Sequence, residues 1–77
     1  MKLTYDPKHN IAYLKLHEKK RGVETIQVSE ELNIDVAPDG TVYGIELLNA
    51  NEQLRAEDEG KLVIEREGKR QEVSLVG

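Results

Sequence analysis

Three turn-forming residues, Pro38, Asp39 and Gly40, separate two runs of the chain that are rich in β-branched residues. Proline fixes φ near the value that a turn requires, an aspartate side chain can accept a bond from the nearby backbone, and glycine adopts a left-handed conformation without strain. The chain must therefore reverse its direction here, which predicts a β-hairpin over residues 32–48. We expect the rest of the fold to be organised around this hairpin.

The length of the loop suggests the register of the hairpin. With a three-residue loop, Val36 would oppose Val42, Ile34 would oppose Gly44, and Leu32 would oppose Glu46. One face would then carry Leu32, Ile34, Val36, Val42 and Leu48, and the other would carry Tyr43, Ile45 and Leu47 beside Asn33 and Asp35. Because a strand that is apolar on both faces needs two covers, we predict that Tyr43, Ile45 and Leu47 meet either the tail of the chain or a second subunit.

A second hairpin is predicted at the N-terminus. Residues 2–5 and 11–16 alternate in polarity as strands do, and the turn formers of residues 6–10 lie between them. A charged loop over residues 17–22 leads to a third strand over residues 23–28. The sequence thus predicts about five short strands before residue 49.

The C-terminal third is predicted to form a short helix and a last hairpin. Asn49 is a suitable N-cap, Glu52 stands at capping-box spacing, and Gly60 can end the helix, which we place at about residues 50–59. The tail, residues 61–76, reverses around Glu67-Gly68. A two-residue loop pairs Leu62 with Val73 and Glu65 with Arg70, whereas a three-residue loop pairs Arg66 with Arg70.

These elements predict an α+β fold that is mainly β: an antiparallel meander of about five strands, one short helix and a C-terminal β-hairpin. We expect a single domain over residues 1–77. A chain of this length buries only about 60–65% of the surface that its unfolded state exposes, so its stability needs help from outside one small core. The chain has no cysteine, which excludes disulfides and thiolate metal sites and leaves self-association as the favoured source of stability.

Charge and hydropathy limit the partners. Fifteen acidic and eleven basic residues give a net charge of −4, which makes nucleic acid an unlikely partner. No apolar run has the length of a membrane span, and the N-terminus lacks the apolar stretch of a signal peptide. We therefore expect a cytoplasmic protein that does not enter the membrane.

Two segments together resemble a known family. Residues 1–7 followed by Ala12-Tyr13-Leu14-Lys15-Leu16, and later Asn33-Ile34-Asp35-Val36 with Asp39-Gly40 and residues 42–50, are similar to the small bacterial and archaeal proteins of the family DUF2283. The resemblance covers about residues 1–50. It implies a small β-rich fold in a prokaryotic protein, with a helix after the last core strand, and it supplies no catalytic residues. It also implies an antitoxin-like or partner-binding role.

The chain departs from the family pattern at two places. Residues 8–10 are Lys-His-Asn where acidic residues are common in the family, and the tail reads as strands. These departures weaken the idea of an acidic site in the first turn, and they leave the tail outside the resemblance.

No metal site is predicted. His9 and His17 are the only histidines, and eight residues of strand would separate them by about 25 Å. A zinc site needs three or four convergent ligands, so both are expected to be surface residues. We predict neither a metal nor a cofactor, and we assign no catalytic residue.

Four carboxylates could in principle do acid–base chemistry. Asp6 and Asp39 are explained as turn residues, whereas Asp35 and Glu46 each interrupt an apolar strand. The register above points the last two to opposite faces, which speaks against a catalytic pair. We expect Asp35 to face solvent or a rim and Glu46 to pair with a nearby cation.

The remaining candidates are a basic run and the tyrosines. The loop residues Lys19, Lys20 and Arg21 could bind a phosphate or an acidic partner, but a solvated, charged loop at a strand end is the simpler interpretation. The three tyrosines could line a pocket, although tyrosines on strands are more often half-buried core residues.

The sequence therefore favours a non-enzymatic domain that acts through protein association, with a homodimer first and Tyr43, Ile45 and Leu47 as its interface. One alternative is an antitoxin-like protein whose acidic charge would capture a small basic partner. Another is a small-ligand-binding or enzymatic protein that uses Asp35, Glu46 and a tyrosine. Convergence of these groups in one cleft would favour this last alternative.

Overall fold

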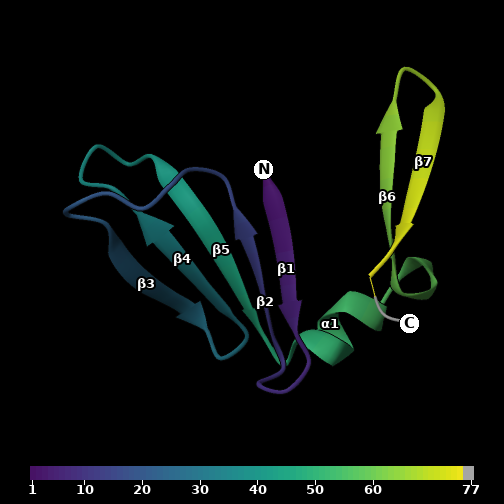
Figure 1. Ribbon diagram of the computed structural model, residues 1–77, viewed down its shortest axis with the longest axis horizontal. Helices are drawn as coiled ribbons and strands as arrows, with labels where there is room; N and C mark the ends of the chain where they lie inside the picture. The colour runs from purple at the N-terminus through teal and green to yellow at the C-terminus, as the bar shows by residue number, and fades with distance from the viewer. Residues whose placement is uncertain (76–77) are drawn as a thin grey trace.

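A computed structural model describes residues 1–75 of the chain. Five strands form one antiparallel sheet, in the spatial order β1-β2-β5-β4-β3 (Figure 1). Their bounds are Lys2–Asp6 for β1, Ile11–Lys15 for β2, Glu24–Ser29 for β3, Leu32–Val36 for β4 and Val42–Leu48 for β5. The predicted fold class is confirmed, with one short helix and a C-terminal hairpin beside the sheet.

The order of the strands places β5 at the centre of the sheet. Two hairpins, β1–β2 and β4–β5, join side by side through the pairing of β2 with β5. The loop between β2 and β3 therefore carries the chain past β5 and β4 to the far edge, so the strands do not follow one another in space as in a simple meander. Consequently β5, the second strand of the hairpin predicted from Pro38-Asp39-Gly40, has a neighbour on each side.

A β-bulge changes the register of the central hairpin. Val36 opposes Val42, as the three-residue loop predicts, but Asp35 then opposes Gly44 and Ile34 opposes Ile45. The extra residue on β5 is Tyr43, and beyond it every predicted pair is displaced by one residue. The predicted pairing of Ile34 with Gly44 is therefore wrong, because a one-residue slip exchanges the two faces of a strand.

The bulge gives the sheet one apolar and one polar face. Residues that oppose each other in a ladder share a face, so the registers assign each strand residue to its side. The apolar face carries Leu3, Tyr5, Ala12, Leu14, Glu24, Ile26, Leu32, Ile34, Val36, Val42, Ile45 and Leu47. We call this set the apolar sheet face. The opposite face is mainly polar and carries Tyr13, Lys15, Thr25, Gln27, Asn33, Asp35, Gly44 and Glu46, with the apolar pair Ile11 and Leu48 at one end. Leu48 is therefore not on the face of Leu32 and Ile34, where the predicted register had placed it.

The apolar sheet face is poorly covered by its own chain. Among the described residues, the only apolar side chains that are wholly buried are Ala12 and Ala50. Leu14, Ile34 and Ile45 lie on the three central strands, where a covered sheet would bury them, yet each is only partly buried. The sheet is thus a single layer whose apolar face is only partly covered.

A side chain from the first turn caps the helix α1, Ala50–Arg55. Asn10 accepts hydrogen bonds from the helix N-terminus through its backbone oxygen, at 3.0 Å from the amide of Ala50, and through its Oδ1, at 2.7 Å from the amide of Asn51. Asn49 has a left-handed backbone, with φ 51°, and no capping bond from its side chain. The predicted capping box of Asn49 and Glu52 is therefore wrong. The helix is also shorter than predicted and is followed by a 3₁₀ turn, η1, Asp58–Gly60.

The C-terminal hairpin stands beside the sheet (Figure 1). It consists of β6, Lys61–Arg66, and β7, Lys69–Ser74, and it pairs Leu62 with Val73 and Glu65 with Arg70. This pairing is the one predicted for a two-residue loop. Val76, the last residue of the predicted hairpin, lies outside the described residues. No helix within residues 1–75 is long and apolar enough to span a membrane.

Candidate functional site

Asp35 is the centre of a hydrogen-bond cluster on the polar face. Its side chain is 6% exposed, and its carboxylate accepts hydrogen bonds from the hydroxyls of Tyr13 and Thr25, each at 2.6 Å. The ammonium of Lys19 lies 3.2 Å from Oδ2 of the same carboxylate. A buried carboxylate is stable only when such donors replace its water. We call Tyr13, Lys19, Thr25 and Asp35 the Asp35 cluster.

The cluster joins four segments of the chain. Thr25 is the cross-strand neighbour of Asp35 on β3, whereas Tyr13 belongs to β2, on the far side of β5. The side chain of Tyr13 crosses β5 at Gly44, where an added Cβ would overlap its hydroxyl and lie 2.9 Å from its Cε1. Gly44 is therefore the residue that lets Tyr13 reach Asp35. Lys19 ties the long β2–β3 loop to the same carboxylate.

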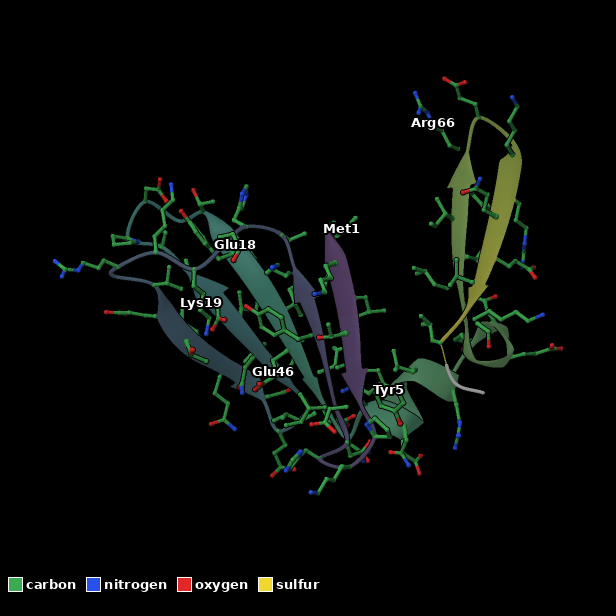
Figure 2. All side chains as sticks on the ribbon, viewed as in Figure 1. Met1, Tyr5, Glu18, Lys19, Glu46 and Arg66 are labelled. Carbon is green, nitrogen blue, oxygen red and sulfur yellow. The ribbon has the colours of Figure 1, made fainter. Side chains whose placement is uncertain are left out.

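A second carboxylate lies on this face. The Oε1 atom of Glu46 accepts a hydrogen bond of 2.8 Å from the side-chain amide of Asn33, its cross-strand neighbour. The Oδ1 atom of Asn33 is buried without a hydrogen-bond partner. Figure 2 shows Lys19 and Glu46 over the same part of the sheet, away from the C-terminal hairpin. A pocket of about 490 Å³ is lined by Tyr13, Lys15, Glu18, Lys19, Thr25, Asp35 and Glu46.

The pKa values of the cluster move away from neutral pH. Burial is the main cause that raises the pKa of Tyr13 to about 12, and the hydrogen bond to ionised Asp35 is the second cause. Burial alone would raise the pKa of Asp35, but the hydrogen bonds from Thr25, Tyr13 and Lys19 outweigh it and hold that pKa below its usual value. At neutral pH the cluster is thus a phenol bound to a carboxylate, and both groups keep their protonation state.

We expect the contribution of Asp35 to stability to depend on pH. Its pKa is lower in the folded than in the unfolded chain, so this contribution is present above the unfolded pKa of about 3.9 and is lost as the pH falls through the folded pKa. Replacing Asp35 with Asn should lower the unfolding free energy by about 1–3 kcal/mol at pH 7. Urea unfolding of both proteins should show this gap narrowing toward pH 3. A gap of equal size at both pH values would contradict the assignment.

The structure brings together carboxylates that the sequence separated. Asp35 and Glu46 share the polar face and line one pocket, so their predicted placement on opposite faces is wrong, and the bulge is the reason. Asp35 is buried and does not face solvent or a rim. Glu46 bonds to an amide, and it makes no ion pair with any residue of the described chain, contrary to prediction. Asp35, Glu46 and a tyrosine, Tyr13, therefore converge in one pocket, which is the arrangement that would favour a ligand site or an enzyme.

The sequence named Tyr13 and Lys19 only as general candidates, a pocket tyrosine and part of a basic loop, and it did not name Thr25. The contact of all three with Asp35 was not predicted, because they come from segments that only strand order brings together. Gly44 was the available signal, because a glycine inside a strand marks a bulge or a close approach of another group. In the basic loop, Lys19 is therefore partly structural, and its ammonium is held by Asp35.

The turn residues and histidines have local partners. Asp6 accepts hydrogen bonds from the amides of Lys8 and His9, and Asp39 accepts one from the amide of Thr41, which confirms both aspartates as turn residues. The Nδ1 atom of His9 also lies 2.7 Å from the Oδ2 atom of Asp6. Within residues 1–75, no three side chains of the types His, Asp and Glu are arranged to hold a metal ion.

The predicted interface residues lie on β5. Ile45 and Leu47 belong to the apolar sheet face, where they join Ile34 and Leu32. They are therefore not on a second apolar side of the hairpin, as the predicted register had it. Tyr43 is the bulge residue, and its ring lies tilted by 52° against that of His17, with centroids 5.2 Å apart. Their role in an interface stays a prediction.

Comparison with known protein families identifies the family of this chain. The model of the family DUF2283, described as a protein of unknown function, matches residues 2–51. No curated protein and no solved structure matches the chain. The matched segment contains the whole five-stranded sheet and the first residues of α1, whereas the C-terminal hairpin lies beyond it.

Proposed function

The chain belongs to the DUF2283 family of proteins of unknown function, and on that premise we propose that it is a non-enzymatic association domain that forms a homodimer. The apolar sheet face is the surface proposed to associate. The observation that supports this proposal is that the apolar sheet face is open over the centre of the sheet, where its aliphatic side chains are only partly buried.

The accessible surface supports this proposal quantitatively. The chain exposes 6027 Å², whereas a compact monomer of its mass exposes about 4,700 Å². Its radius of gyration is 13.7 Å, against about 11.5 Å for a compact chain of this length. The excess, about 1,300 Å², is more than the roughly 800 Å² that each partner contributes to a stable interface of standard size.

We propose a second copy of the same chain as the partner that covers the apolar sheet face. Along the paired strands the apolar sheet face carries one charged side chain, Glu24, so two copies can meet without burying like charges at their centre. An isologous contact also closes at two subunits and leaves no open apolar face to promote further assembly. Large apolar interfaces of this kind are typical of obligate homodimers.

The Asp35 cluster favours a structural role over acid–base catalysis. A general acid or base works best with a pKa near the working pH, whereas the pKa of Tyr13 is raised to about 12 and that of Asp35 is lowered. Both oxygens of Asp35 already accept hydrogen bonds from within the protein. We assign the cluster to holding the β2–β3 loop against the sheet.

The mass in solution tests the homodimer. We expect light scattering at micromolar concentration to give twice the 8.7 kDa of one chain. Because folding and association are then coupled, the melting temperature should rise with protein concentration. A mass of 8.7 kDa together with a melting temperature independent of concentration would overturn the proposal.

A further inference from the structure

The C-terminal hairpin, β6–β7, has one apolar face that its own chain leaves exposed. Leu62, Ile64 and Val73 share this face, and they are 41%, 46% and 50% exposed. Figure 1 shows the hairpin standing clear of the five strands, joined to them through α1 and η1. An isolated two-stranded hairpin is marginally stable in water and needs a surface to pack on.

The two faces of the hairpin differ in how their charges are paired. On one face Lys61, Glu65, Arg70 and Glu72 form a chain of ion pairs with N–O distances of 3.0–3.6 Å. On the apolar face the charged residues are Arg66 and Lys69, both basic and both at the tip. Neither makes an ion pair with any residue among 1–75. The first face is thus suited to solvent, and the second is suited to a partner that is apolar with an acidic edge.

The apolar sheet face has this character. Its one charged strand residue is Glu24, at the start of the edge strand β3, and Ile26 follows two residues later on the same face with 51% exposure. On the hairpin, Ile64 stands two residues before Arg66, again on one face. If the tip cations meet Glu24, the strand spacing places Ile64 against Ile26.

We propose that two copies exchange their C-terminal hairpins, so that the apolar face of each hairpin covers part of the apolar sheet face of the other copy. This inference rests on the homodimer proposed above and names the element that forms its interface. The exchange is reciprocal, and the two contacts are equivalent by a twofold axis. Within one chain the hairpin lies beyond β1, at the opposite edge of the sheet from Ile26 on β3 (Figure 1). A contact between Ile64 and Ile26 therefore requires the second copy.

Cross-linking tests the exchange directly, because the chain has no cysteine of its own. Two full-length variants are prepared, Ile64→Cys and Ile26→Cys, with tags of different length so that the two chains can be told apart. They are mixed, refolded together and oxidised. We expect a disulfide between the two unlike chains. Gln27→Cys is the matched control, since Gln27 neighbours Ile26 on β3 but lies on the polar face. It should give no cross-link with Ile64→Cys.

A charge substitution gives the second measurement. Ile64→Lys should raise the dissociation constant of the dimer about a hundredfold. This is the effect expected when a residue at the centre of an interface is replaced. Glu65→Gln changes the net charge by the same amount on the solvent face of the same strand and should leave the constant unchanged.

The outcomes separate the two proposals. If the wild-type chain is a dimer, but Ile64→Lys leaves its mass unchanged and the unlike chains do not cross-link, the exchange is wrong and the homodimer stands. If the wild-type chain is a monomer at micromolar concentration, both proposals are wrong. A disulfide within one chain of the double variant Ile26→Cys, Ile64→Cys would show the hairpin folding onto its own sheet, and this also overturns the exchange.

Discussion

Replacing Ile45 with Lys is expected to convert the homodimer into monomers. Ile45 lies on the central strand β5, opposite Ile34 and Leu14, in the middle of the apolar sheet face. Burying an isoleucine side chain contributes about 1.5–3 kcal/mol, and a twofold interface contains the residue twice, so the loss is about 3–6 kcal/mol per dimer. An ammonium in the apolar interface adds a desolvation cost to this.

Light scattering and thermal unfolding measure this effect. The mass should fall from two chains to one, and the melting temperature should drop and lose its dependence on concentration. Gln27→Lys adds the same charge to the polar face and is the control, because it should keep the wild-type mass. Leu47→Lys should act like Ile45→Lys, and Tyr43→Lys tests the bulge end of the predicted interface. An unchanged mass and melting curve for Ile45→Lys would exclude this surface.

The second large effect is expected from Gly44→Ala. The added methyl group would overlap the ring and hydroxyl of Tyr13, so Tyr13 must swing away and Asp35 loses a hydrogen-bond donor. Overpacking of this kind costs about 1–3 kcal/mol, and a buried carboxylate that lacks a donor adds to the cost. We therefore expect Gly44→Ala to destabilise the protein strongly, although it adds only one carbon.

A double-mutant cycle identifies the cause. In the background of Tyr13→Ala the overlap is absent, so Gly44→Ala should then cost little. The interaction energy between the two positions should be about 1–3 kcal/mol, in the range found for residues in contact. Urea unfolding of the four proteins measures it. An equal loss with and without the tyrosine ring would show that Gly44 is needed for another reason.

Local patterns predicted most of the elements. The turn at Pro38-Asp39-Gly40, the turn at Glu67-Gly68 and the N-terminal hairpin each follow from residues within a few positions of one another, and all three are present. The helix was predicted in place but with the wrong cap. Its cap comes from Asn10, about forty residues earlier in the chain, and no local rule could name that residue.

The candidate site was the part that sequence predicted least well. Asp35 and Glu46 were singled out correctly as carboxylates inside apolar strands, but a loop length fixes register only as far as the first bulge. The extra residue at Tyr43 moved Glu46 to the face of Asp35 and moved Ile45 and Leu47 to the face of Ile34.

The sequence by itself determined where the chain turns and which segments are strands. These properties depend on side-chain chemistry over a few neighbouring residues. Only the tertiary structure decided that β5 lies between β2 and β4, that Tyr13 crosses Gly44 to reach Asp35, and that the apolar side chains over the centre of the sheet are only partly buried. The physical reason is that these features arise from hydrogen-bond ladders between distant strands, where a single bulge exchanges the two faces.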